Sequence, residues 1–496
     1  MAAAGDGAPA RPSLSLSLAG AAGLLLLHLA RLPFHEMWRD EWQTWLTARS
    51  SADLGALIEN TRYDGHPMFW MLLVWLLSKL TSAPWAMQVL HAVAAAAGSF
   101  VLLRYAPFPR WVKALLVLGY FPFFEYAVIS RNYALGVLLL AVVCALLASA
   151  RPRPLLLGSV LGLLGWTSAY AALLAIAFLA LITAEVARSD RLPALGRRGS
   201  ALTALAVGCI GVAFAIVDGL PSAGSGFATP WHWHWNATHA LRAVSAVYRG
   251  LLPVPRPGAH FWDTNLLDEF PRGEAALGAA GVVIVAWLLR STRARLYWVS
   301  AALSVAAFSY VKYIGSVRHQ GFYFLALGVA FWLESASLEP ARVGKLRRGL
   351  AATFLGVHVL AALYATAMDL RHPFSASREA ARWLQVQDFA RLPIVGEADT
   401  QVSPLAGLLG EPLYYVRGER WGTFVLFDQA RSTPPGPAAI VAGIERVAAE
   451  RRSPVLLVLS NGAELAPAPP GWRRLAAFHD SIVATETYVV YLAPAP

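Results

Sequence analysis

The feature that most constrains this chain is a series of long apolar runs separated by short charged loops. About 20 helical residues cross a membrane core about 30 Å thick, because each residue of a helix rises 1.5 Å. Eleven runs meet or approach this length, near residues 14–34, 84–103, 111–129, 132–150, 154–169, 170–187, 201–217, 275–290, 296–313, 319–335 and 349–367. The sequence therefore predicts an all-α polytopic membrane protein with about eleven transmembrane helices.

Composition agrees with a membrane protein. Of the 496 residues, 57% are hydrophobic and 14% are charged, whereas a soluble domain carries roughly 25% charged residues. The run at 14–34 is too long for a typical signal-peptide core and has no obvious cleavage site, so we predict a retained first span. Cys144 and Cys209 lie in separate apolar segments and predict neither a disulfide framework nor a metal-thiolate site.

Loop charge predicts the orientation. A further run, 66–81, is short, begins with Pro67 and contains Lys79, so it either spans the membrane or lies along the interface. If it is interfacial, every arginine-dense loop falls on one side, which the positive-inside rule assigns to the cytoplasm. These loops lie near 104–113, 151–153, 188–198, 290–295 and 342–348. We therefore predict a cytoplasmic N-terminus and an external C-terminus, and the net charge of +11 indicates orientation rather than nucleic-acid binding.

The composition changes after the last apolar run. Residues 368–496 predict a small external α/β domain, with strands around Ile394, Val455 and Tyr488 and helices over Ser377–Gln387 and Ala438–Arg451. This domain either takes part in the chemistry or is only a packing cap. Residues 1–13, which are rich in small residues, are expected to be disordered.

The first polar cluster, His35–Gln43, begins the external loop 35–83. A carboxylate pair such as Asp40-Glu41 at the membrane boundary is costly unless it is paired or used. Neighbouring helix residues point about 100° apart, so the two cannot both address one atom, and one of them is the better catalytic candidate. The alternative is a solvated loop start with Arg39 as the ion-pair partner.

Three further clusters are predicted on the same side. Asp64 and His66 lie in Tyr63-Asp64-Gly65-His66-Pro67, which is either functional or an ordinary helix start. Arg131 lies in Ser130-Arg131-Asn132-Tyr133 and could instead balance Glu125. The stretch 310–319 carries cations against the positive-inside pattern, which suggests a bound phosphate or contact with lipid headgroups.

The long external loop 218–274 contains alternating Trp and His residues, Trp231–Asn236, and then His260–Asp263. His232 and His234 could bind a metal, but no third ligand has a convincing spacing. Aromatic anchoring at the interface is the favoured interpretation. The polar break Trp166–Tyr170 predicts a tight turn between two short helices.

Taken together, one carboxylate, several cations and many aromatic residues suit the transfer of a sugar from a polyprenyl phosphate to an external hydroxyl or amide. Cations would stabilise the leaving phosphate, and the carboxylate would act as general base. A transporter or lipid-linked glycan flippase is the alternative. It predicts repeats and charges near the midplane, whereas this sequence has no internal repeat and its polar clusters lie at one face.

The order of Arg39-Asp40-Glu41, Asp64-Gly65-His66-Pro67, Ser130-Arg131-Asn132-Tyr133 and Arg318-His319 resembles the GT-C superfamily of integral-membrane glycosyltransferases. It is most similar to the protein O-mannosyltransferases, aminoarabinose transferases and rhizobial lipopolysaccharide transferases. The resemblance implies that Asp40 is the catalytic base of an inverting transfer and that the donor's polyprenyl phosphate lies in a cavity under the external face. It also leaves a divalent metal open, because some relatives use one.

The chain departs from the family pattern at two places. Met68 replaces the second proline of a His-Pro-Pro motif, and 86–91 lacks the arginine that the family often has, so phosphate contact falls to Arg131, Lys312 or Arg318. The predicted catalytic residues are Asp40 and Glu41, and the predicted substrate contacts are Arg39, Trp42, Asp64, His66, Arg131, Tyr133, Lys312, Tyr313, Arg318 and His319. Frequent Ala and Arg with little Lys suggests a GC-rich bacterial genome, hence undecaprenyl phosphate, the inner membrane and a periplasmic site.

Overall fold

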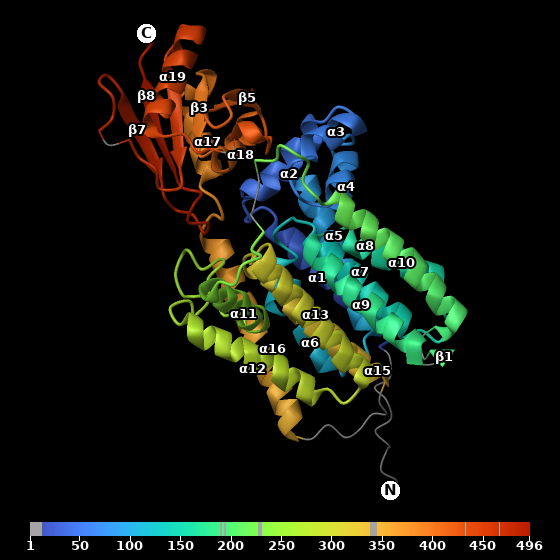
Figure 1. The fold of residues 1–496 in the computed structure, drawn as a ribbon. Coiled ribbons are helices and arrows are strands. Elements are labelled where there is room, and N and C mark those ends of the chain that lie inside the picture. The colour runs from blue at the N-terminus through green and yellow to red at the C-terminus, as the bar shows by residue number, and fades with distance from the viewer. Residues whose placement is uncertain are drawn as a thin grey trace.

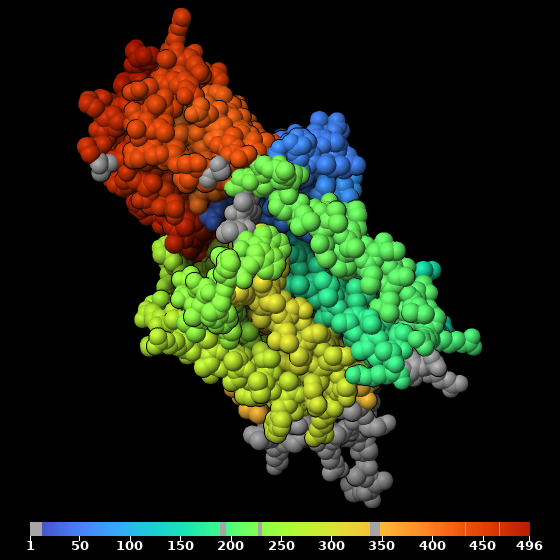
Figure 2. All heavy atoms as spheres, viewed as in Figure 1, coloured from blue at the N-terminus to red at the C-terminus, as the bar shows by residue number. Residues whose placement is uncertain are grey.

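The computed structural model describes residues 12–188, 191–192, 195–226, 231–337, 345–431, 433–465 and 467–496. A bundle of helices extends to Arg371, and a smaller domain of strands and helices follows it (Figure 1). This C-terminal domain (orange and red) packs against one end of the bundle, beside the blue segment of α2 to α4 (Figure 2). The predicted disordered stretch 1–13 lies outside the described residues except for its last two.

Seven helices among the described residues are long and apolar enough to cross a membrane. They are α1 (Leu14–Arg31), α5 (Trp85–Tyr105), α9 (Ala169–Arg188), α10 (Arg198–Asp218), α12 (Pro271–Leu288), α13 (Thr292–Val311) and α16 (Lys345–Arg371). Other predicted runs form shorter helices, α6 (Arg110–Val117), α7 (Tyr133–Leu147), α8 (Pro154–Gly165) and α15 (Phe322–Ser337). The predicted all-α polytopic fold is confirmed, and the count of eleven crossings stays a prediction.

The run 111–129 is not the continuous helix that its hydropathy predicts. Helix α6 ends at Val117, and a π-helical turn, η1 (Tyr120–Glu125), follows. Pro122 lies in this turn, and a proline has no N–H to donate to a continuous α-helix. The interruption places Glu125 and the turn before α7 at the end of the bundle that faces the C-terminal domain.

The predicted external segments are also helical. The first loop contains α2 (Arg39–Ser50), α3 (Leu54–Thr61) and α4 (Phe69–Ser78), and the loop 218–274 contains α11 (Ala237–Leu251). Helix α4 has 10 residues, which extend about 15 Å, or half of a membrane core. Its length favours the interfacial placement of 66–81, which stays a prediction.

Small residues allow close helix packing inside the bundle. A Cβ added to Gly162 of α8 would lie 2.9 Å from the Cα of Gly211 on α10, closer than real Cβ contacts. Glycine is therefore required where these two helices cross, as is common between membrane helices. The predicted turn at 166–170 is confirmed, because α8 ends at Gly165 and α9 begins at Ala169.

Strand β1 (Arg191–Leu192) and the turn between α12 and α13, both in arginine-rich segments, lie at the end of the bundle away from the C-terminal domain (Figure 1). Arg293, at the start of α13, pairs with Glu185 near the end of α9. Glu334, near the end of α15, accepts hydrogen bonds from the backbone N–H of Arg290 (2.9 Å) and Ser291 (2.7 Å). These contacts join neighbouring helix ends within the arginine-rich segments, and the cytoplasmic location of this end stays a prediction.

The C-terminal domain is the predicted α/β domain. Its six strands are β3 (Ile394–Glu397), β4 (Leu413–Tyr415), β5 (Arg420–Gly422), β6 (Val455–Ser460), β7 (Arg473–Phe478) and β8 (Tyr488–Ala493), in the order β5-β4-β3-β6-β8-β7. Among the described strands of this sheet, β3 pairs in parallel with β4 and with β6, and the other neighbouring strands pair antiparallel. The predicted strands correspond to β3, β6 and β8, and the predicted helices to α17 (Ser377–Val386) and α19 (Pro437–Arg451).

Helices cover both faces of this sheet. Strand β6 is buried along its whole length, and its alternate residues enter two separate cores. Leu456 and Val458 pack on the side of α17 and α18 (Asp399–Leu409), while Leu457 and Leu459 pack on the side of α19. The domain is thus a three-layer α/β structure, and α17 and α18 are on the side of the sheet that meets the rest of the chain.

Candidate functional site

The first polar cluster lies where the chain leaves α1 and enters α2. Trp38 is extended and α2 begins at Arg39, so Asp40 and Glu41 occupy the first turn of the helix. Carboxylates are favoured there because the N-terminal end of a helix carries partial positive charge. The two side chains have different partners, as expected for neighbouring helix positions.

Glu41 is completely buried. Its carboxylate accepts hydrogen bonds from the backbone N–H of Trp38 (3.2 Å) and of Ser130 (2.7 Å), and it contacts His35 Nε2 at 3.2 Å. Both oxygens are therefore in use, and they tie the start of α2 to the turn before α7. This geometry favours a positioning role for Glu41, and its catalytic role stays a prediction.

His35 is buried between two carboxylates. Its Nδ1 lies 3.0 Å from Asp369 near the end of α16, and its Nε2 faces Glu41. Burial by itself would lower the pKa of His35, but Asp369 and Glu41 raise it to about 10. The imidazole is therefore cationic at neutral pH and joins the start of α2 to the last long helix of the bundle.

Three arginines surround the half-buried carboxylate of Asp40. Its oxygens lie 3.4 Å from Arg318, 3.7 Å from Arg39 and 3.8 Å from Arg131. Burial would raise the pKa of Asp40, but Arg131, Arg318 and Arg39 outweigh it and hold that pKa below its usual value. Asp40 is therefore ionised and shared among three cations that come from three different segments.

Arg318 reaches Asp40 from α14 (Val317–Gln320). Its guanidinium lies over the rings of Trp38 and Trp262, at 4.9 Å and 5.3 Å from their centres. Aromatic faces attract a cation and hold its plane in place. The Nε of Arg318 is buried and has no hydrogen-bond partner among the described residues, so this guanidinium keeps a donor that is not satisfied.

Arg131 lies in the turn between η1 and α7. It donates a hydrogen bond to the backbone oxygen of Asp40 at 2.9 Å, in addition to its ion pair with the carboxylate. Among the described residues, Arg131 forms its ion pair with Asp40, and no ion pair joins it to Glu125. Glu125 instead accepts hydrogen bonds from the Tyr120 hydroxyl (3.1 Å) and from Trp262 Nε1 (3.0 Å), which braces the tryptophan beneath Arg318.

The second motif lies within electrostatic range of these charges. His66 is exposed, and its Nδ1 lies 2.8 Å from the backbone oxygen of Asp64. One carboxylate oxygen of Asp64 is buried without a hydrogen-bond partner among the described residues. Burial raises the pKa of Asp64 to about 8, although Arg131 and Arg431 oppose the rise. Burial therefore favours the protonated form of Asp64, whereas the nearby arginines favour the ionised form of Asp40.

Tyr133, Tyr313 and His319 meet beside Arg318. The backbone N–H of Ser316 donates to His319 Nδ1 at 3.1 Å, so a neutral ring carries its proton on Nε2 and donates it to the Tyr133 hydroxyl at 3.1 Å. The ring of Tyr313 packs edge-on against His319 with centres 5.3 Å apart. These side chains form an aromatic and polar wall next to the arginines.

Two predicted substrate contacts have other neighbours. Lys312 Nζ lies over the ring of Trp231 at 4.7 Å, in the aromatic loop. Trp42 is 6% exposed, and its ring lies against Gly407 of α18, where no Cβ could fit. Both positions favour packing, and the predicted substrate contacts of these two residues stay predictions.

The C-terminal domain supplies residues that the sequence did not indicate. Arg39 donates from its guanidinium to Thr485 Oγ1 (2.8 Å) and from its backbone N–H to Glu486 Oε1 (3.0 Å). Glu486 is completely buried, and burial raises its pKa to about 8. Gln43 also pairs with both backbone groups of Val425, at 2.7 and 2.9 Å. The domain therefore contacts the same helical turn that carries Asp40.

The structure thus brings together most of the predicted residues and adds others. Asp40, Arg39, Arg131 and Arg318 form one charged centre, with the Trp38 and Trp262 rings holding Arg318. Trp38 and Trp262 belong to the sequence clusters 35–43 and 260–263, but only the structure shows that both rings contact the guanidinium of Arg318. Within the described part of the chain, no group of three or more His, Cys, Asp or Glu side chains is placed to hold a metal ion.

Comparison with protein-family models and with curated proteins gives no match. Among solved structures, the chain is similar to ArnT from Cupriavidus metallidurans in the apo state, with 15% identity, a TM-score of 0.53 and 97% of each chain covered. ArnT from the same organism bound to undecaprenyl phosphate gives 13% identity and a TM-score of 0.49 over 97% of each chain. The first likeness shows that bundle and C-terminal domain together have the ArnT fold.

Proposed function

We propose that this protein is a membrane glycosyltransferase. It moves a sugar from a polyprenyl-phosphate donor to a lipid, glycan or protein acceptor, at the external face of a bacterial inner membrane. The observation that carries the proposal is the Asp40 carboxylate held among Arg39, Arg131 and Arg318 at one end of a membrane bundle. The ArnT-like fold agrees with it, because ArnT is a glycosyltransferase of the GT-C superfamily.

The arginines serve the leaving group. When the bond between the sugar and the phosphate breaks, negative charge collects on the phosphate, and cations already in place stabilise that charge without reorganising. Arg318 is held by two tryptophans and keeps an unsatisfied Nε–H. A guanidinium also matches phosphate geometry in a bidentate way. Arg318 and Arg131 are therefore the donor-phosphate ligands of the proposal.

Asp40 serves the acceptor. A carboxylate removes the proton from the attacking hydroxyl or amide, and attack from the face opposite the phosphate inverts the anomeric centre. In this structure the arginines hold the pKa of Asp40 low, which makes it a weak base. A donor phosphate that shares Arg131 and Arg318 would weaken these ion pairs and make Asp40 more basic, so the base becomes active only after the donor has bound.

The proposed orientation follows from charge. The arginine-rich end of the bundle is the cytoplasmic end by the positive-inside rule, so Asp40 and the C-terminal domain face the periplasm. A transporter or flippase would place its charged residues near the membrane midplane. Asp40 instead lies in the first turn of α2, outside the long helices.

The test is transfer by purified protein from a panel of undecaprenyl-phosphate sugars, with an envelope lipid extract as acceptor. Asp40→Asn should lower the rate about 10²–10⁴-fold, the usual contribution of a general base. Glu59→Gln is the matched control, because Glu59 is an exposed acid of the same external loop, and it should keep full activity. An Asp40→Asn protein with wild-type transfer rates would refute the assignment.

A further inference from the structure

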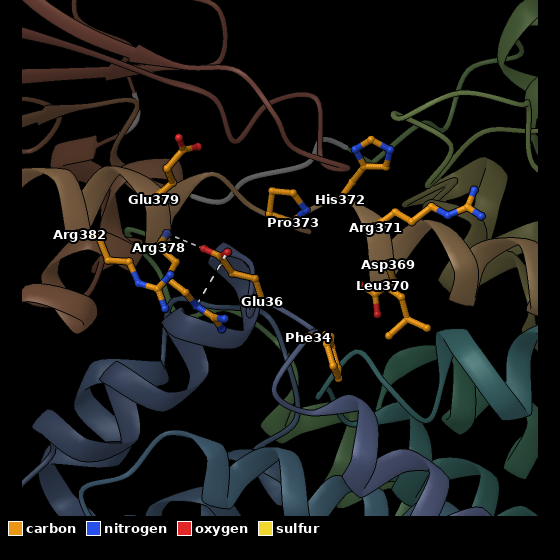
Figure 3. A pocket seen from close by; sticks show the side chains of 10 residues that line it. All are labelled: Phe34, Glu36, Asp369, Leu370, Arg371, His372, Pro373, Arg378, Glu379 and Arg382. Carbon is orange, nitrogen blue, oxygen red and sulfur yellow. Dashed lines mark hydrogen bonds and ion pairs between the residues drawn. The ribbon is translucent and has the colours of Figure 1, made fainter.

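A cavity lies apart from Asp40, at the junction of the bundle and the C-terminal domain. It has a volume of about 300 Å³, and its wall combines the ends of α1 and α16 with one face of α17. Figure 3 shows Arg378 and Arg382 on one side of the cavity and Arg371 and His372 on the other side, with Pro373 between the two pairs. The proposed transfer chemistry uses none of these side chains.

The accessible charge of this cavity is positive. Asp369 is held by His35, and Glu36 by Ser377 and the backbone N–H of Arg378, so both carboxylates are buried and engaged. Arg371 and Arg382 are exposed and have no ion-pair partner among the described residues. Glu379 is the exposed acid of the cavity wall and Asp480 pairs with His372.

Two of the arginines repel each other. Arg378 and Arg382 are four residues apart on α17, so they project from the same face of the helix. A like-charged pair at this spacing destabilises a helix. Arg378 has a long ion pair with Glu36 at 3.9 Å, and a bound anion would offset the remaining repulsion.

The cavity lies at the ends of two helices that are long and apolar enough to cross a membrane. Phe34 follows α1 and Leu370 is in the last turn of α16, and they are 57% and 46% exposed. Both are large apolar side chains at the ends of helices long enough to cross a membrane. Apolar side chains below and guanidinium groups above match an acyl chain that ends in a phosphate.

We propose that this cavity binds the phosphate headgroup of a lipid, attracted by the arginines of its wall, with Arg371 on one side and Arg378 and Arg382 on the other. The phosphate belongs either to an anionic phospholipid of the surrounding leaflet or to a polyprenyl phosphate outside the catalytic centre. Both present the same chemistry to the arginines. This site does not depend on the proposed transferase activity, and its test measures binding alone.

The experiment is native mass spectrometry of the full-length protein, released from phosphatidylcholine vesicles that also contain phosphatidylglycerol or undecaprenyl phosphate. In an Arg318→Ala background, which weakens the proposed donor site at Asp40, the variant Arg371→Gln/Arg382→Gln should retain the phosphate lipid about 25-fold less well, at about fivefold per arginine. Arg474→Gln is the matched control, since Arg474 is exposed on β7 and pairs with Glu464, and it should retain lipid as the wild type does.

The two lipids distinguish the sources. Weaker retention of phosphatidylglycerol assigns the cavity to the surrounding leaflet, and weaker retention of undecaprenyl phosphate alone assigns it to the carrier. Glu379→Gln removes the exposed acid of the same wall and should strengthen retention. Unchanged retention of both lipids by the double variant would overturn the proposal, and so would a loss of equal size in Arg474→Gln.

Discussion

At the scale of single residues, the proposed donor site depends on how the side chain of Arg318 is held. A flexible arginine would lose rotamer freedom on binding a phosphate, at a cost of up to about 2 kcal/mol. Trp38 and Trp262 have already restricted this side chain, and Glu125 fixes Trp262 from behind. The site therefore presents a cation whose orientation is set before the donor arrives.

We expect Arg318→Ala to impair donor use more than acceptor use. A hydrogen bond to a charged group contributes about 1.5–3 kcal/mol, so the KM for the donor should rise about 10- to 100-fold. Arg256→Ala, an exposed arginine of the external loop that pairs with Glu269, is the control. Steady-state kinetics with each substrate varied in turn gives the comparison, and equal losses toward donor and acceptor would point to a structural role instead.

The pKa of Asp40 makes a prediction about pH. A base must be ionised to act, so activity falls as pH drops through its pKa. Nearby arginines hold that pKa low in the free protein, and kcat/KM reports the free protein while kcat reports the loaded one. The acid limb of kcat should therefore lie at higher pH than the acid limb of kcat/KM. Coincident limbs would show that donor binding leaves the ion pairs of Asp40 unchanged.

At the scale of elements, the start of α2 is the part that assembles the site. Adjacent positions in one helical turn direct Asp40 toward the arginines and Glu41 toward the backbone of Trp38 and Ser130. One carboxylate thereby fixes the geometry that the other uses. Sequence spacing predicted that the two could not share a target, but it could not identify which segment each would meet.

We expect Glu41→Ala to destabilise the protein. The substitution leaves the buried N–H groups of Trp38 and Ser130 without an acceptor, and each unsatisfied group lowers the free energy of unfolding by about 1–3 kcal/mol. The midpoint of thermal unfolding in detergent should fall, and kcat should fall with little change in the donor KM, because α2 is displaced. Glu41→Gln keeps an acceptor oxygen and should lie between the alanine variant and the wild type. A Glu41→Gln protein that is as stable as the wild type but inactive would instead support the predicted catalytic role of Glu41.

Elements also show how far the sequence could predict this structure. Apolar runs located most of the helices because membrane burial requires long stretches without charge. They failed at 111–129, where Pro122 interrupts the helix, and they could not identify α2, α3 and α11, which are amphipathic or polar. Strands β4 and β5 were missed because each has only three residues, too few to show alternation.

At the scale of the whole molecule, the C-terminal domain contacts the segment that carries Asp40 at several points. Thr485 and Glu486 contact Arg39, Val425 pairs with Gln43, and Ser377 donates to Glu36. Three segments of the C-terminal domain therefore contact residues 36–43, the stretch that includes Asp40. The sequence could not reveal this, because more than 440 positions separate Arg39 from Glu486 and one sequence without an alignment carries no signal for that pairing.

We expect Glu486→Ala to lower kcat although the residue belongs to the other domain. It removes the acceptor for the Arg39 backbone N–H and loosens an arginine that pairs with Asp40. Glu486→Gln should largely rescue the rate, because burial raises the pKa of Glu486 to about 8 and the native side chain is mostly uncharged at neutral pH. Transfer rates of the two variants decide this, and a Gln variant as impaired as Ala would show that the negative charge itself is needed.

Asp40, Arg131 and Arg318 form the proposed site for a polyprenyl-phosphate donor. The most direct measurement is a structure of the full-length protein in lipid nanodiscs with undecaprenyl phosphate added. We predict a phosphate within hydrogen-bonding distance of Arg318 or Arg131, with the carboxylate of Asp40 released from at least one of its ion pairs. A phosphate bound elsewhere, with the Asp40 ion pairs as they are here, would contradict it.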